Sequence, residues 1–208
     1  MPRWSVPRMW EGSTVAILAS GPSMCQAVAD KVRDSGLLTV VINTTCRLAL
    51  WADLLHAADE RWWLKYHDKD ARSFKGLKSC CEDTSFDDVM TVLSSGSVGF
   101  DDSPFHVRSG GNSGYSAIHI AAHAGASRIL LFGYDAHSGP DGEQHWHGRH
   151  PEPLRNAGDG IYERWLEWYV PFAAELNKRG VAVLNCTPNS ALRVWPCMSF
   201  EEALCNVS

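Results

Sequence analysis

Residues 15–24 read VAILASGPSM, and this stretch decides the fold class. A short apolar run rich in β-formers is typical of a strand that is buried on both faces. A strand that breaks at a glycine turn and opens a helix is the unit from which parallel α/β sheets are built. We therefore predict a strand over residues 14–19 and a helix over residues 23–34, with Pro22 in the first turn of that helix.

The rest of the chain repeats this alternation. We expect further strands at 37–42, 53–58, 89–93, 128–132 and 181–184, a helical turn at 46–51, and helices from 59 onward, at 113–124 and at 161–178. This order predicts one Rossmann-like, three-layer α/β domain over residues 1–208 with a mainly parallel sheet. Ligands of such sheets bind at the carboxyl ends of the strands, and the polar loop 137–160 is expected to lie over that cleft.

The composition and net charge of the chain limit the kinds of molecule that it can bind. The chain has 208 residues, of which 45% are hydrophobic, and its net charge is −5. This length suits one well-buried core, and the negative charge argues against general nucleic-acid binding. A basic stripe on one helix face would be the local exception. Its members recur at helical spacing: Arg61, Lys65, Lys69, Arg72 and Lys75.

The sequence also predicts a cellular setting. The amino terminus lacks the apolar core of a signal peptide, and no apolar run approaches membrane-spanning length. The chain has seven cysteines without a CxxC pair, which argues against a disulfide framework and against a zinc knuckle. We therefore expect a cytoplasmic protein without a membrane span. Formation of a homo-oligomer is compatible with the sequence.

The first candidate ligand site is the turn Ser20, Gly21, Pro22 and Ser23. Gly21 lacks a Cβ, so a phosphate can approach the backbone, and the free N–H groups and the Ser23 hydroxyl offer donors to it. A tight turn between strand and helix favours glycine and proline on steric grounds as well. Both interpretations stand, because the turn is neither a P-loop nor a complete GxGxxG motif.

Two further polar groups follow predicted strands or open a predicted helix. Asn43 comes directly after the strand at 37–42, where it would contact a ribose or base, or cap the next turn. The glycine cluster 109–114 opens a helix and forms a second candidate anion site through Asn112, Ser113 and Gly114. Asn112 or Ser113 would equally serve as the N-cap of that helix.

The third group is Asp135 with the histidine-rich loop beyond it. Asp135 follows an apolar strand, a position that suits contact with a metal, a ribose hydroxyl or an acceptor nucleophile, and it is a candidate catalytic residue. The loop contains HWHGRH, in which His145, His147 and His150 are candidate general bases or substrate contacts. The alternative is a loop pinned by imidazole hydrogen bonds. Neither a cysteine nor a regular ligand spacing favours zinc here, so we assign no metal site.

Several other residues carry weaker signals. His119 and His123 lie four apart on a predicted helix, but their small apolar neighbours favour packing over metal binding. Trp146 lies between two histidines in a loop and is a candidate for stacking on a ligand. Polar residues 185–190 follow the last predicted strand and either close the pocket or form a simple turn.

The ordered motifs resemble those of two related families. A strand into SGPS, a strand into Asn43 and then SGGNSGYSAIHIAAHAGASRILLFGYD are similar to bacterial CMP-sialic acid-dependent sialyltransferases. They are also similar to archaeal-type 6-hydroxymethylpterin diphosphokinase-like proteins, and the carboxyl-terminal part looks like small phage and surface-sugar proteins of this superfamily. The resemblance covers about residues 13–135. It implies a variant Rossmann-like domain and nucleotide phosphates near Gly21, Pro22 and Ser23, with Asn43 near the nucleotide.

The resemblance leads to three hypotheses. The first is a sialyltransferase-like glycosyltransferase that uses a nucleotide-activated donor and a histidine general base, with a small molecule or glycan as acceptor. The second is diphosphate transfer from ATP to a pterin-like hydroxymethyl acceptor, in which Asp135, with Asp141 or Glu143, would bind Mg²⁺. The third is a nucleotide-binding protein without catalysis. Apart from the nucleotide donor, of CMP-sugar or ATP type, no cofactor is predicted.

Overall fold

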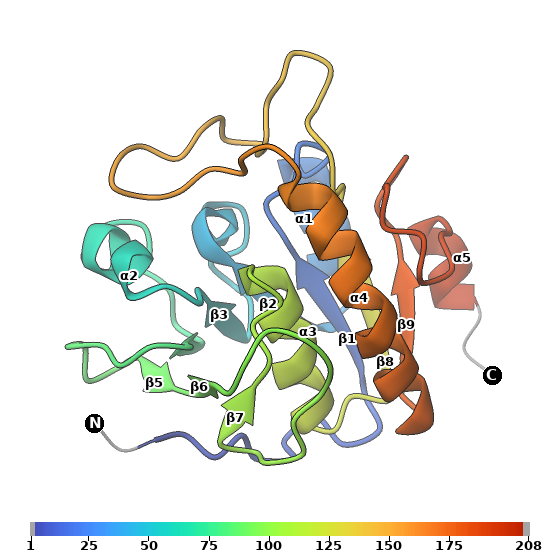
Figure 1. The fold of residues 1–208 in the computed structure, drawn as a ribbon, viewed down its shortest axis with the longest axis horizontal. Coiled ribbons are helices and arrows are strands. Elements are labelled where there is room, and N and C mark those ends of the chain that lie inside the picture. The colour runs from blue at the N-terminus through green and yellow to red at the C-terminus, as the bar shows by residue number, and fades with distance from the viewer. Residues whose placement is uncertain (1–2, 206–208) are drawn as a thin grey trace.

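A computed structural model describes residues 3–205 of the chain. Its centre is a seven-stranded sheet in the order β5-β4-β3-β2-β1-β8-β9 (Figure 1). The strands are β1 (Thr14–Leu18), β2 (Leu38–Ile42), β3 (Leu54–His56), β4 (Leu77–Cys80), β5 (Met90–Thr91), β8 (Arg128–Phe132) and β9 (Ala182–Asn185). All neighbouring strands pair in parallel. The predicted parallel α/β architecture is therefore confirmed.

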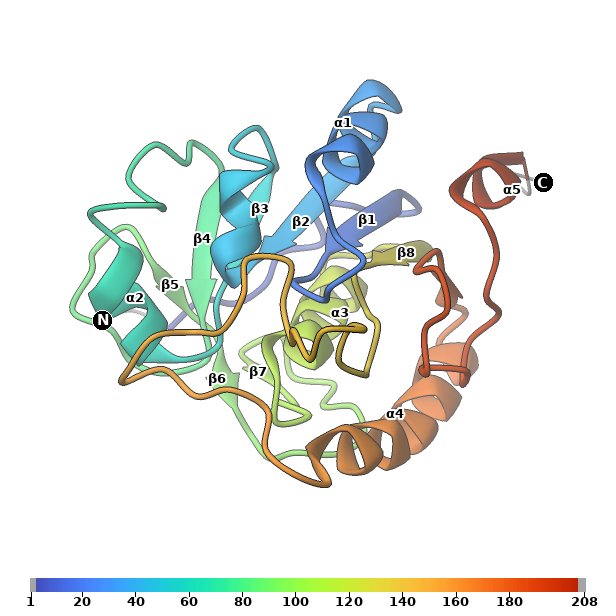
Figure 2. The same ribbon diagram turned by 90° about the horizontal axis from the view of Figure 1, so that it is seen from above.

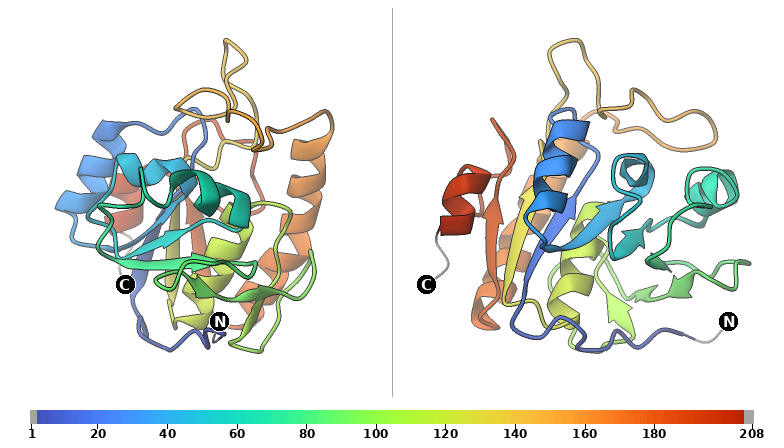
Figure 3. Two further views of the ribbon diagram at one scale, coloured as in Figure 1. Left: turned by 90° about the vertical axis from the view of Figure 1, so that its left-hand side faces the viewer. Right: turned by 180° about the vertical axis from the view of Figure 1, so that it is seen from behind.

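Helices cover both faces of the sheet (Figure 2). α3 (Ser113–His123) and α4 (Ile161–Lys178) pack on one face, together with a small parallel pair, β6 (Leu93–Ser94) and β7 (His106–Val107). The other face carries α1 (Gln26–Asp34), the 3-10 helix η1 (Asn43–Arg47), α2 (Glu60–Tyr66) and α5 (Phe200–Cys205). Figure 3 shows the same layers edge-on.

The alternation of β1 explains why both faces are covered. Val15 and Ile17 belong to the apolar cluster under α3 and α4, whereas Ala16 and Leu18 belong to the cluster under α1. All four side chains are fully buried. Burying one large aliphatic side chain stabilises a fold by about 1.5–3 kcal/mol, so a strand that is apolar at every position requires helices on both sides.

The chain order creates a switch point beside β1. From β1 the chain moves outward through β2, β3, β4 and β5, and it then returns to form β8 on the other side of β1. The connections that leave β1 and β8 therefore diverge at their carboxyl ends. Parallel sheets bind ligands in the crevice that this divergence leaves open.

Most predicted elements agree with the structure to within one or two residues, and four predictions are wrong. The helical turn expected at 46–51 is the 3-10 helix η1, which lies earlier, at Asn43–Arg47. The helix predicted at 23–34 begins only at Gln26, so Pro22 lies in the preceding turn. The predicted strand at 89–93 is divided between β5 and β6. α2 ends at Tyr66, so the five basic residues between 61 and 75 do not share one helix face. Among the described residues no helix has the length and hydropathy needed to cross a membrane.

Candidate functional site

A cavity of about 640 Å³ lies at the carboxyl ends of β1, β2 and β8. Its walls include the SGPS turn after β1, Asn43 after β2, Asp135 after β8 and the amino end of α3. Viewed from above, the loop that follows Asp135 passes over this edge of the sheet before it enters α4 (Figure 2). The volume falls within the range of about 300–1,000 Å³ that is typical of small-molecule sites.

The SGPS turn binds a carboxylate of the protein itself. The backbone N–H of Ser23 donates to Asp135 Oδ1 at 3.0 Å, and the Ser23 hydroxyl donates to Asp135 Oδ2 at 2.9 Å. The N–H of Gly21 donates to the Gly133 carbonyl at 3.0 Å. The prediction that Ser23 offers free donors to a phosphate is therefore wrong, because Asp135 occupies them.

Burial affects the pKa of the Asp135 carboxyl group. Asp135 is only 4% exposed, and its burial raises its pKa above the ordinary value. The two hydrogen bonds from Ser23 and the nearby His137 lower the pKa and oppose that rise. The Asp135 carboxylate thus accepts hydrogen bonds from the turn and also contributes to the cavity wall.

The packing around Gly21 explains the glycine in the motif. A Cβ at this position would lie within van der Waals overlap of the Asp135 carboxylate, and 2.5 Å from the Gly133 carbonyl oxygen. The glycine is required because the turns after β1 and β8 lie against each other. Ser20 is also structural, since its hydroxyl lies 2.9 Å from the Thr45 hydroxyl and 3.3 Å from the Ile42 carbonyl oxygen.

Asn43 joins the ends of β2 and α3. Its backbone has a positive φ of 51°, a conformation that asparagine adopts more readily than most residues. Its Oδ1 accepts from the Ser113 hydroxyl at 3.3 Å, and the same hydroxyl accepts from the Ala58 N–H at 3.1 Å. Asn43 is the first residue of η1 rather than its cap. Backbone strain of this kind is often found at functional sites.

The amino end of α3 has backbone donors that are not used within the described chain. Asn112 is the N-cap, and its Oδ1 accepts from the N–H of Tyr115 at 2.9 Å. Within residues 3–205 the N–H groups of Ser113 and Gly114 have no hydrogen-bond partner. Both residues line the cavity. Of the two glycine turns that the sequence singles out, the second is the one whose donors are available to a ligand.

The three loop histidines come together. One ring nitrogen from each of His145, His147 and His150 lies within 4.8 Å of the other two. His145 and His150 line the cavity, whereas His147 does not. Burial is the main cause that lowers all three pKa values, to about 4 for His147 and about 3 for His150. The imidazoles are therefore neutral at pH 7.

Trp146 does not line the cavity, so the prediction that it stacks on a ligand is wrong. Its indole N–H donates to the Thr45 hydroxyl at 3.1 Å, and its ring packs against the apolar cluster on the α1 face. Its backbone N–H donates to the Ser20 carbonyl at 3.1 Å. Trp146 thus fastens the histidine loop to the SGPS turn.

Further cavity residues come from the far end of the loop, from α4 and from α2, where Arg61 is one of the basic residues noted in the sequence. Arg155 and Arg61 form no close ion pair or side-chain hydrogen bond within the described chain, but both interact electrostatically with Asp59, which also lines the cavity. Aromatic side chains contributed by α4 complete the wall, namely Tyr162, Trp165 and Tyr169. The Trp165 Nε1 atom and the Gln144 Oε1 atom are buried without a partner among residues 3–205. No local motif marks these positions, because their role depends on where the loop folds.

His119 and His123 are structural, as their neighbours suggest. His119 is fully buried; its Nδ1 accepts from the Arg108 N–H at 3.0 Å, and its ring stacks on that of His123 at 4.7 Å. His123 Nε2 lies 3.0 Å from the His106 carbonyl oxygen. Burial lowers both pKa values. Of residues 185–190, Thr187 and Ser190 are buried and hydrogen-bonded to the backbone beside Asp135.

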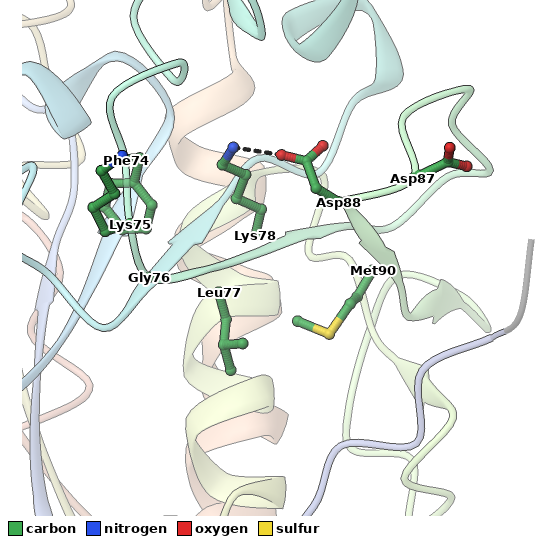
Figure 4. Close-up of a pocket in the computed structure, with 8 residues that line it drawn as sticks. All are labelled: Phe74, Lys75, Gly76, Leu77, Lys78, Asp87, Asp88 and Met90. Carbon is green, nitrogen blue, oxygen red and sulfur yellow. Dashed lines mark hydrogen bonds and ion pairs between the residues drawn. The ribbon is translucent and has the colours of Figure 1, made fainter.

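A second, more open hollow of about 340 Å³ lies at the amino ends of β4 and β5, on the opposite edge of the sheet (Figure 4). Its main polar contact is the pair between Lys78 Nζ and Asp88 Oδ2 at 2.6 Å. His67 Nε2 also lies 2.7 Å from Asp88 Oδ1. These charges satisfy one another, so the hollow offers less to a ligand than the cavity at the carboxyl edge.

Neither a family model, a curated protein nor a solved structure matches the chain. Function is therefore argued from the geometry of the cavity and from the chemistry of its side chains.

Proposed function

We propose that the protein is a transferase that binds a nucleotide-activated donor in the cavity at the carboxyl edge of the sheet. The observation that best supports this proposal is the amino end of α3, whose free N–H groups face a cavity that also contains two arginines without a close ion pair and several aromatic rings. A nucleotide combines a phosphate, a polar sugar and a flat base. Helix N–H groups and guanidinium groups bind the first, and aromatic side chains stack on the last.

The donor phosphates would bind between α3 and the loop. The N–H groups of Ser113 and Gly114 offer two donors, and Arg155 and Arg61 supply positive charge from the same cavity. Asn43 and Ser113 would approach the sugar. The unpartnered Trp165 Nε1 and Gln144 Oε1 provide a donor and an acceptor for the base or the transferred group. The SGPS turn then has a supporting role: it fixes Asp135 in the wall.

For the reaction we favour transfer to a hydroxyl acceptor, as the resemblance to sialyltransferases suggests. The acceptor oxygen forms a bond to the reacting carbon of the donor, the bond from that carbon to the nucleotide phosphate breaks, and the phosphate leaves with the electron pair. The acceptor proton goes to a ring nitrogen of His145 or His150, the histidine general base of this proposal. Both residues lie in the cavity wall, and His147 does not. The α3 amino end stabilises the charge on the leaving phosphate.

The diphosphokinase alternative receives less support from the geometry. It requires several carboxylates around a magnesium ion bound to ATP. Asp141 and Glu143 are exposed and do not line the cavity, and Asp135 is bound to Ser23. Two other carboxylates, Asp59 and Glu82, do line it, but Glu82 accepts from the Glu60 N–H at 2.7 Å and Asp59 interacts with Arg61 and Arg155. A thermal-shift screen of CMP, CDP, UDP, GDP, ADP and ATP, with and without Mg²⁺, separates the hypotheses. Stabilisation by a nucleotide without Mg²⁺ supports the glycosyl hypothesis, stabilisation only by Mg-ATP supports the alternative, and no stabilisation contradicts both.

A substitution in the cavity tests the phosphate site. We expect Arg155→Gln to raise the Kd for the nucleotide found in the screen roughly 10-fold or more, because a hydrogen bond to a charged group contributes about 1.5–3 kcal/mol. Arg72→Gln is the matched control, since Arg72 is exposed and lies outside the cavity. Titration calorimetry measures both. Equal Kd values for Arg155→Gln and the wild type would show that the phosphates do not bind beside Arg155.

A further inference from the structure

The loop HWHGRH holds three imidazole groups in one cluster, formed by His145, His147 and His150. Their ring centroids lie 5.2, 4.5 and 4.8 Å apart, and one nitrogen from each is within 4.8 Å of the others. If the histidines served only to hold the loop in place, their ring nitrogens would form hydrogen bonds with the rest of the protein. The His147 Nε2 and His150 Nδ1 atoms are instead buried without any partner among residues 3–205.

The backbone of the loop is built to hold this arrangement. The Gly148 N–H donates to the His145 carbonyl at 3.0 Å, and the positive φ of Gly148, 83°, turns the chain between the second and third histidines. The backbone of His150 is clamped by Asn156, which accepts from its N–H at 2.7 Å and donates to its carbonyl at 2.9 Å. Trp146, fastened to Thr45 and Ser20, fixes the first part of the loop.

We propose that His145, His147 and His150 form a zinc site with three protein ligands and one open position toward the cavity. Imidazole is a common ligand of Zn²⁺, and three histidines with one exchangeable position are a recurrent form of catalytic zinc site. A tetrahedral ion with Zn–N bonds of about 2.0–2.1 Å holds its ligand nitrogens about 3.3 Å apart, so the three rings draw together when the ion binds.

The surroundings agree with this assignment. A hydrogen bond between the His145 ring and the backbone of Ser20 would orient that ligand, as outer hydrogen bonds commonly do at zinc sites. His145 and His150 line the cavity, so the open position of the ion faces the space proposed for the donor and acceptor. Zinc binding itself does not depend on the proposed function. The catalytic role of the zinc does depend on the proposed function: a bound zinc ion, rather than a free imidazole, would then polarise the acceptor oxygen.

Zinc titration of protein that carries no histidine tag and has been stripped of metal tests the site. We expect one Zn²⁺ per chain, an increase in Tm on binding, and the visible spectrum of tetrahedral Co²⁺ when cobalt replaces zinc. His147→Gln and His150→Gln should each weaken zinc binding about 100-fold or more, because each removes a ligand. Circular dichroism of the metal-free variants checks that the fold is intact.

His137→Gln is the matched control in the same loop. Its Nδ1 lies 2.8 Å from the Ser138 carbonyl oxygen and its Nε2 lies 3.2 Å from that of Asn189, so its ring faces backbone oxygens and lies outside the three-histidine cluster. Its zinc affinity should equal that of the wild type. The proposal is overturned if the folded wild type binds no zinc, or if the variant with both His147→Gln and His150→Gln binds it as tightly. Zinc binding without nucleotide binding would contradict the proposed function alone, and the reverse result would contradict the zinc site alone.

Discussion

Gly21→Ala should lower the free energy of unfolding by about 3 kcal/mol, because the added methyl group has no space. Its Cβ would overlap the Asp135 carboxylate and lie 2.5 Å from the Gly133 carbonyl oxygen. The backbone oxygen cannot move without shifting the end of β8. Denaturant unfolding followed by circular dichroism measures the loss.

Gly158→Ala provides the matched control for that variant. No heavy atom lies within 4 Å of a Cβ built at Gly158, and its φ is outside the left-handed region. The same substitution should therefore leave stability unchanged or raise it slightly, since alanine restricts the unfolded chain. Equal stabilities for Gly21→Ala and Gly158→Ala would show that the turns after β1 and β8 are not in close contact.

Asp135→Ala should lower the free energy of unfolding by about 2–4 kcal/mol. The substitution leaves the N–H and the hydroxyl of the half-buried Ser23 without their acceptor, and an unsatisfied buried group costs about 1–3 kcal/mol. Asp135→Asn should retain most of the stability, because the amide oxygen accepts from the Ser23 N–H and the amide nitrogen can donate to the hydroxyl. Asp141→Ala, in the exposed part of the same loop, should have no effect.

The comparison of wild type with Asp135→Asn also has an expected pH dependence. Burial raises the pKa of Asp135 in the folded protein above its ordinary value of 3.8, so the folded state retains this proton more strongly than the unfolded state. The contribution of this proton to the free energy of unfolding is fully present below pH 3.8, and it is lost as the pH rises through the pKa of Asp135 in the folded protein. Unfolding measured from pH 3.5 upward should show the wild type losing stability relative to Asp135→Asn. A relative gain would contradict the buried position of the carboxylate.

Local pattern predicted most of the fold. Continuous apolar runs such as RILLF and LTVVI mark β8 and β2 because a strand covered on both faces must be apolar throughout. β4 was missed because its sequence LKSC contains Lys78 and Ser79, whose burial depends on partners elsewhere: Lys78 pairs with Asp88, and Ser79 lies 2.9 Å from a His56 ring nitrogen. The residues around β4 in the sequence do not reveal that His56, 23 residues before Ser79, lies beside it.

The candidate site was predictable in position but not in detail. The rule that ligands bind at the carboxyl ends of parallel strands located Asn43, the 109–114 turn and Asp135 on one edge. Which glycine turn has free donors was not predictable, because the competitor for the SGPS donors, Asp135, lies more than a hundred residues away in the sequence. The three histidines were singled out from the sequence as candidate general bases, but their convergence on one point was not predictable. Their spacing follows no regular ligand motif, and only the turn at Gly148 brings the rings together.

The central claim is that a nucleotide binds with its phosphate at the amino end of α3. A crystal structure of the protein with the nucleotide selected by the thermal-shift screen tests it most directly. We expect a phosphate within hydrogen-bond distance of the Ser113 and Gly114 N–H groups, with Asp135 still bound to Ser23. A phosphate that displaces Asp135 from Ser23, or a nucleotide bound outside the cavity, would contradict it.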